Sequence, residues 1–179
     1  MTLKEISAMT GAGLAAGLIG TAAMTASSTI EARLRGRKDS TAPATVGGQV
    51  LHVQPTDEEG KKRLSMFMHW EYGINWAFLQ PILDLLGIRG VGIGALIQFA
   101  AVWGTSLVML PATGVSKPIT EWEPDEIAID MLHHAIYSLA VSAAYSLFRN
   151  GNEEEIEKWK DELDRNWKFE PEVLAEDTF

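Results

Sequence analysis

The sequence predicts an all-α protein: a bundle of four transmembrane helices followed by a short amphipathic surface helix. Three observations support this. Ile6–Ile30 and Gly90–Ser116 contain no charged residue, and each is long enough to cross a hydrocarbon core of about 30 Å as a helix. Two further apolar segments, around residues 64–88 and 126–149, contain few ionisable residues. A highly charged segment closes the chain.

These segments define the expected domain organisation. Residues 1–150 form a four-helix transmembrane domain, and residues 151–179 form an acidic amphipathic tail. We expect the spans at about 6–31, 64–88, 90–115 and 126–149, with a basic loop at 32–63.

Composition excludes several functional classes. The chain of 179 residues has a net charge of −9, so no basic face is left for general nucleic-acid binding. It has no cysteine, which excludes disulfides, thiolate metal sites, iron–sulfur clusters and a catalytic thiol. There is no Walker loop, G-x-S-x-G, H-E-x-x-H or dinucleotide fingerprint. These absences identify no reaction, and the expected partner is the lipid bilayer.

The first span is rich in small residues. Gly13-Leu-Ala-Ala-Gly17 is a GxxxG motif, and Gly20 continues the small-residue face. Small residues at this spacing let helix backbones approach closely in lipid, so we expect this face to contact a neighbouring helix. The loop that follows contains a candidate short interfacial helix at Ala44–Val53.

Proline and glycine mark the boundaries of the later spans. Pro81 should kink or end the second span, and the tight turn Gly87–Gly90 implies an antiparallel return. Pro124 followed by two acids indicates the start of the fourth helix. In the tail, apolar residues recur at helical spacing among charges, which predicts an amphipathic helix on a membrane or a partner. They are Ile156, Trp159, Leu163 and Trp167.

Charge asymmetry predicts the orientation. We expect the protein in the inner (plasma) membrane of the cell. Seven Lys or Arg residues lie between Arg33 and Arg63, and this positive charge predicts that the 32–63 loop is cytoplasmic. Four spans then place both termini on the opposite side.

Ionisable residues should meet in one layer near that loop. The second and fourth spans both start on the side of the 32–63 loop, and the first span ends on that side. His69 and His133 each lie about 10 Å into their spans by helical rise, and therefore at matching depth. Charged groups inside a membrane usually face the bundle interior. The expected members are Glu31, His69, Glu71, Asp130, His133 and His134.

Three interpretations of the layer remain open. In the first, it is a structural network that fixes helix register, because buried polar groups need partners. In the second, it binds a divalent metal through Glu31, His69, Asp130, His133 and His134, or a haem through His69, His133 and His134. The third is a proton or solute path. His69 should then lie within direct or water-bridged hydrogen-bonding distance of the other groups.

The layout resembles a group of small bacterial inner-membrane proteins of unknown function, loosely the YagU-like group. The similar features are Gly20-Thr-Ala-Ala-Met-Thr25, the basic exit Arg-Leu-Arg-Gly-Arg, His69-Trp70 and Asp130-x-x-His133-His134. The resemblance covers about residues 6–149 and implies membrane location alone.

Two function hypotheses follow from the sequence. The first is a non-enzymatic membrane subunit or accessory protein, which associates with other membrane subunits or itself through small-residue faces and the tail. The second is a metal- or haem-binding membrane protein that uses the histidine layer.

Overall fold

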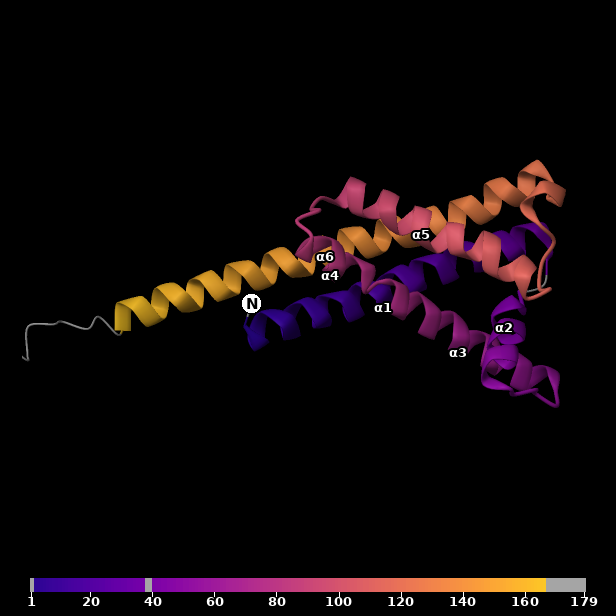
Figure 1. Cartoon of the computed structure of the whole chain (residues 1–179), viewed down its shortest axis with the longest axis horizontal. Coiled ribbons are helices and arrows are strands. Elements are labelled where there is room, and N and C mark those ends of the chain that lie inside the picture. The colour runs from indigo at the N-terminus through magenta and orange to yellow at the C-terminus, as the bar shows by residue number, and fades with distance from the viewer. Residues whose placement is uncertain (1, 38–39, 167–179) are drawn as a thin grey trace, which may run out of the picture.

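The computed structural model describes residues 2–37 and 40–166, and its regular structure there is entirely helical. Six α-helices and one short 3-10 helix follow one another along the chain (Figure 1). They are α1 (Leu3–Arg35), α2 (Ala42–Leu51), α3 (Glu58–Trp76), α4 (Leu79–Leu85), α5 (Val91–Ala112), the 3-10 helix η1 (Ile119–Glu121) and α6 (Pro124–Asn166).

The chain traverses the bundle four times. α1 packs against α3 and α6, and α5 packs against α6. At one end the Arg35 guanidinium of α1 lies 2.7 Å from an Asp125 carboxylate oxygen of α6. At the other end an Asp84 oxygen of α4 lies 3.8 Å from Arg149 Nε of α6. α3 and α4 together therefore make the second traverse.

Three helices are long and apolar enough to cross a membrane: α1, α5 and the Pro124–Gly151 part of α6. This supports an integral membrane protein. The predicted second span is not among them, because the segment is interrupted and α3 extends into the charged loop as far as Glu58.

The interruption lies where Pro81 requires it. Proline has no N–H to donate to the carbonyl four residues earlier, and its ring clashes with that carbonyl. For Pro81 this is the carbonyl of Ala77. The helix tightens there: the Ala77 N–H donates to the Ile74 carbonyl (3.2 Å) and the Gln80 N–H to Ala77 (3.1 Å). α3 thus ends at Trp76 and the short α4 begins at Leu79. The 64–88 segment is therefore interrupted close to Pro81, as the sequence predicted.

The tight turn before α5 is confirmed. Gly87 and Gly90 have φ angles of 76° and 118°, in the region that favours glycine. They reverse the chain between α4 and α5. α2, which covers most of the predicted Ala44–Val53 helix, is likewise confirmed within the loop.

The glycine face of α1 packs inside the bundle, as predicted. A Cβ added at Gly17 would lie 2.9 Å from the Ile74 Cα of α3, and one at Gly13 would lie 3.0 Å from Pro81 Cγ of α4. Gly20 lies against Val141 and Tyr137 of α6. The GxxxG motif therefore joins helices of this chain and is not open to a partner.

α6 differs from the prediction in its length. It continues unbroken from Pro124 to Asn166, so the expected surface helix is an extension of the fourth span. Gly151 lies within it; a helical glycine costs about 1 kcal/mol relative to alanine and does not end the helix. Figure 1 shows this part of α6 projecting beyond the other helices. The side chains of Ile156, Trp159 and Leu163, and all of Trp167, lie outside the described residues.

Candidate functional site

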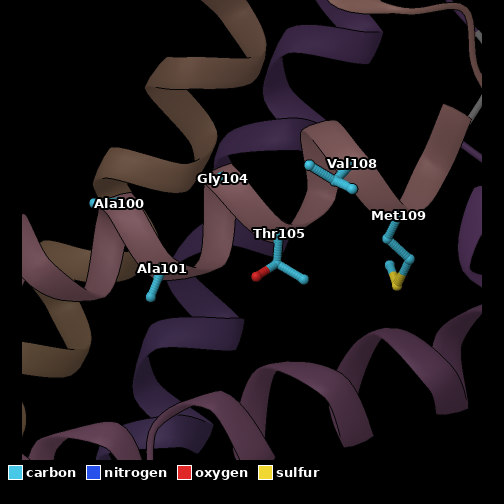
Figure 2. A pocket seen from close by; sticks show the side chains of 6 residues that line it. All are labelled: Ala100, Ala101, Gly104, Thr105, Val108 and Met109. Atoms are coloured by element: carbon cyan, nitrogen blue, oxygen red, sulfur yellow. The ribbon is translucent and has the colours of Figure 1, made fainter. Parts of the chain in front are cut away.

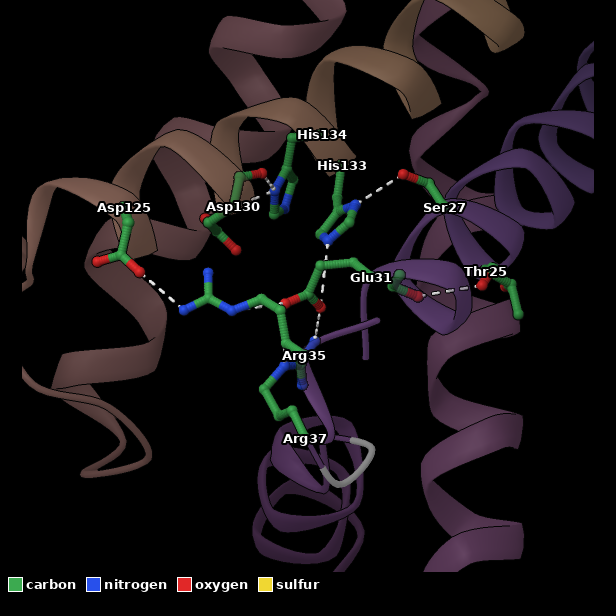
Figure 3. A network of polar contacts seen from close by, with 10 residues as sticks. Thr25, Ser27, Glu31, Arg35, Arg37, Asp125, Asp130, His133 and His134 are labelled. Carbon is green, nitrogen blue, oxygen red and sulfur yellow. Dashed lines mark hydrogen bonds and ion pairs between the residues drawn. The ribbon is translucent and has the colours of Figure 1, made fainter. Parts of the chain in front are cut away.

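Glu31 is the centre of a charged cluster at the end of α1. Its carboxylate pairs with Arg37, lies 3.7 Å from Arg35 Nε and lies 3.9 Å from His133 Nε2 (Figure 3). The backbone conformation of Gly36 allows these contacts. Its φ angle of 63° lies in the left-handed region and ends α1, as glycine commonly does after a helix. The chain then turns back, and Arg37 reaches the carboxylate one turn before the helix end.

His133 connects this cluster to the interior. Its side chain is nearly buried, with an exposed fraction of 8%. Its Nδ1 lies 2.8 Å from the Ser27 hydroxyl of α1. In the described part of the chain its Nε2 has no hydrogen-bond partner, and a Glu31 carboxylate oxygen lies 3.9 Å away. At that separation a bridging water is the natural link.

His69 is held by α1 as well. Its Nε2 lies 3.0 Å from the Thr25 hydroxyl, which donates its own hydrogen to the Thr21 carbonyl at 2.7 Å. Because a hydroxyl has a single hydrogen, the His69 ring must donate from Nε2. Thr25 and Ser27 are two residues apart, about 3 Å along the helix axis, so His69 and His133 lie at similar depth, as predicted.

No direct hydrogen bond or ion pair joins His69 to Asp130, His133 or His134 in the described part of the chain. α1 instead bonds to a histidine of α3 on one side and to a histidine of α6 on the other. The sequence identified the histidines but missed the two hydroxyls that bind them. Their signal was the run of Ser and Thr in the last turns of an apolar helix.

Asp130 and His134 form a second part of the layer. The Trp103 indole of α5 donates to an Asp130 carboxylate oxygen at 2.8 Å. His134 Nδ1 donates to the Asp130 backbone carbonyl at 2.8 Å and lies 3.6 Å from its carboxylate. The layer therefore draws on α1, α3, α5 and α6, and Trp103 was not anticipated.

Glu71 does not join the layer. Its side chain is exposed and accepts a hydrogen bond from Asn75 Nδ2 at 2.6 Å on the same face of α3. Its inclusion among the layer residues was wrong, because two positions along a helix turn the side chain well away from the His69 face.

The metal interpretation finds no ready-made ligand set. Among residues 2–37 and 40–166, no group of three or more His, Asp or Glu side chains is close enough to hold a metal ion. Asp130, His69, His133 and His134 instead each have at least one hydrogen bond to the protein.

A second polar cluster lies at the opposite end of the bundle. Arg89 Nε donates to an Asp84 oxygen at 2.7 Å, and the Tyr145 hydroxyl lies 3.3 Å from the other oxygen. Arg149 Nε lies 3.8 Å from Asp84. A cavity of about 20 Å³ adjoins these groups. This cluster was not predicted from the sequence, because its members come from three separate segments.

The comparisons with known proteins identify no relative. No known protein family matches the chain, and neither a curated protein nor a solved structure is significantly similar to it.

Proposed function

We propose that this chain is a non-enzymatic subunit of a membrane assembly, which receives a transmembrane helix of a different polypeptide on the outer face of α5. In this proposal α3 and α4 complete a fourth span in the plasma membrane. The 32–63 loop is cytoplasmic, because it carries the densest positive charge, and both termini lie on the other side.

The observation that carries the proposal is a shallow, open hollow of about 470 Å³ on one face of α5. Its lining is formed by Ala100, Ala101, Gly104, Thr105, Val108 and Met109. A Cβ added at Gly104 would meet no atom within 4 Å, and Figure 2 shows the Thr105 and Met109 side chains pointing away from α6. Small residues on a lipid-facing helix permit close approach of another helix.

The charge of the α6 extension favours a different polypeptide over a second copy. Residues 152–166 contain seven acidic and three basic residues. In a twofold dimer inside a membrane, two such extensions would lie on the same side and repel. A partner with a basic segment on that side would be attracted instead.

Photo-crosslinking in native membranes tests the proposal. A crosslinking amino acid at Thr105 should capture one specific polypeptide with a transmembrane helix, whereas the same group at Leu139, a lipid-facing position of α6 with 56% exposure, should not. Gly104→Leu should abolish the adduct by filling the hollow. The proposal fails if position 105 yields no more adduct than position 139, or if the captured protein is a second copy of the chain.

A further inference from the structure

The inward face of α6 carries polar side chains along its whole transmembrane length. They recur at intervals of three and four residues, and we name them the α6 polar stripe: Asp130, His133, His134, Tyr137, Ser138, Ser142, Tyr145 and Arg149. From Asp130 to Arg149 the helix rises about 28 Å, nearly the thickness of a hydrocarbon core. The opposite face presents Leu132, Leu139 and Leu147, each more than half exposed.

We propose that the α6 polar stripe, together with the polar groups of α1, α4 and α5 that face it, is a transmembrane proton path between Glu31–His133 and Asp84. Each end holds a carboxylate, and groups able to exchange a proton or hold a water lie between them.

The Glu31 end is open to the loop side. Arg35 and Arg37 flank Glu31, and Asp125 pairs with Arg35. Asp130 and His134 lie beyond His133 on the next face of α6. The His133 imidazole has Ser27 on one nitrogen, and its other nitrogen, which has no hydrogen-bond partner among the described residues, lies 3.9 Å from Glu31. An imidazole can accept a proton on one ring nitrogen and release another proton from the second ring nitrogen.

The middle of the path contains buried hydroxyl groups without protein partners. Thr21 and Ser138 are each 1% exposed, and in the described residues neither hydroxyl has a hydrogen-bond partner. Buried polar groups of this kind characteristically bind internal water. The Tyr137 hydroxyl lies one turn beyond His133 and donates to the Gly73 carbonyl.

Two glutamines line the path toward α4, and their amide groups can hold a relaying water by hydrogen bonds. Gln98 of α5 is fully buried and donates to the Trp76 carbonyl at 2.9 Å. Gln80 Nε2 donates to Gln98 Oε1 at 3.2 Å. A Cβ added at Gly94 would lie 2.6 Å from the Ser142 hydroxyl and 2.8 Å from Gln80 Oε1, so these two polar atoms border the same backbone position.

The cavity at the Asp84 end is the size of one water. Its lining includes Gln80, Ser142, Tyr145 and Asp84, and about 10–15 Å³ of probe volume is enough to hold a water molecule. Asp84 itself is 9% exposed and faces Arg89 and Arg149. A cavity of about 20 Å³ accommodates a water and is too small for an organic solute, which favours a proton over a larger solute as the transported species.

Transport requires no change in covalent chemistry. A proton that enters at one carboxylate displaces a proton along the chain of hydroxyls and waters, and one leaves at the other carboxylate. The membrane potential or the pH difference sets the direction.

Proton flux into vesicles tests the inference. The purified full chain is reconstituted into phospholipid vesicles that enclose a pH-sensitive dye, and a potassium gradient with valinomycin sets the membrane potential. We expect acidification well above that of protein-free vesicles, and the same rate when sodium is replaced by choline. Asp84→Asn and His133→Phe should lose this flux, and Asp84→Glu should retain it.

Controls separate the path from a structural network. Glu71→Gln changes an exposed carboxylate of α3 outside the path and should keep the full rate. Thr21→Val and Ser138→Ala remove hydroxyls without breaking an ion pair, and should lower the flux while the protein elutes as a folded species. A wild-type rate equal to that of protein-free vesicles overturns the inference, as does undiminished flux in folded Asp84→Asn, Thr21→Val and Ser138→Ala.

Discussion

The Tyr137 hydroxyl of α6 supplies the hydrogen bond that the Gly73 carbonyl of α3 lacks at the end of its helix. In an uninterrupted helix that carbonyl would accept from the Ala77 N–H, but Ala77 donates to Ile74 instead. The Tyr137 oxygen lies 2.5 Å from the Gly73 oxygen and takes over the role. The break that Pro81 imposes on the second traverse is thus compensated by the fourth.

Tyr137→Phe should therefore destabilise the bundle by about 1–2 kcal/mol, because it leaves a buried carbonyl unpaired. Thermal unfolding in mild detergent measures the change. Tyr72→Phe is the matched control, since the Tyr72 hydroxyl has no hydrogen-bond partner in the described residues. Equal melting temperatures for the two variants would show that the Tyr137 bond contributes nothing.

Gly17→Leu should lower stability sharply. Even a Cβ at this position would lie 2.9 Å from the Ile74 Cα, and overpacking typically costs about 1–3 kcal/mol. Gly11→Leu introduces the same side chain on the same helix where nothing lies within 4 Å, so it should be tolerated. The measurement is again melting in detergent, and similar losses in both variants would contradict the packing of this face against α3.

Thr25→Val and His69→Phe should be non-additive. Each removes one partner of the bond between α1 and α3, so the double variant should lose less than the sum of the single losses, with a coupling of roughly 0.5–1.5 kcal/mol. The pair Ala26→Val and His69→Phe provides a control on the exposed face next to Thr25. An additive cycle for Thr25 and His69 would mean that the contact does not stabilise the bundle.

Membrane location and orientation are tested by single cysteines, since the natural chain has none. The protein should remain in the membrane pellet after a carbonate wash. A membrane-impermeant maleimide should label Gly151→Cys in intact cells and Gln54→Cys only after permeabilisation. The reverse pattern would invert the orientation, and labelling of both sites in intact cells would contradict four traverses.

Helical periodicity and charge-free length were sufficient to predict α1, α5 and the membrane part of α6. They left out two features in which a local effect competes with tertiary structure. The disruption of the helix before Pro81 could be predicted from the sequence. The hydrogen bond from Tyr137 to the Gly73 carbonyl, which stabilises the interrupted helix, could not. At Gly151 the change in composition suggested a boundary, yet glycine alone does not end a helix that is already formed.

The site was predictable to a similar degree. Histidine and carboxylate positions were readable because ionisable groups are conspicuous in apolar segments. Their partners Thr25 and Ser27 were not, because hydroxyls are common in small-residue helices and a long-range pair leaves no trace in the spacing. The Asp84 cluster depends on the turn at Gly87 and Gly90, which brings Arg89 back to α4.

The interrupted second traverse also has a consequence for biogenesis. α3 contains Lys61, Lys62, His69, Glu71 and Asn75, so on its own it partitions poorly from the translocon into lipid. α1, synthesised first, is apolar enough to insert alone and already displays Gly17 and Thr25 toward the incoming segment. α4 and the turn at Gly87 connect α3 to α5, which has the highest mean hydropathy of the three candidate spans. We therefore expect insertion of the second traverse to wait until α5 has been synthesised, so that the two enter the bilayer as one hairpin.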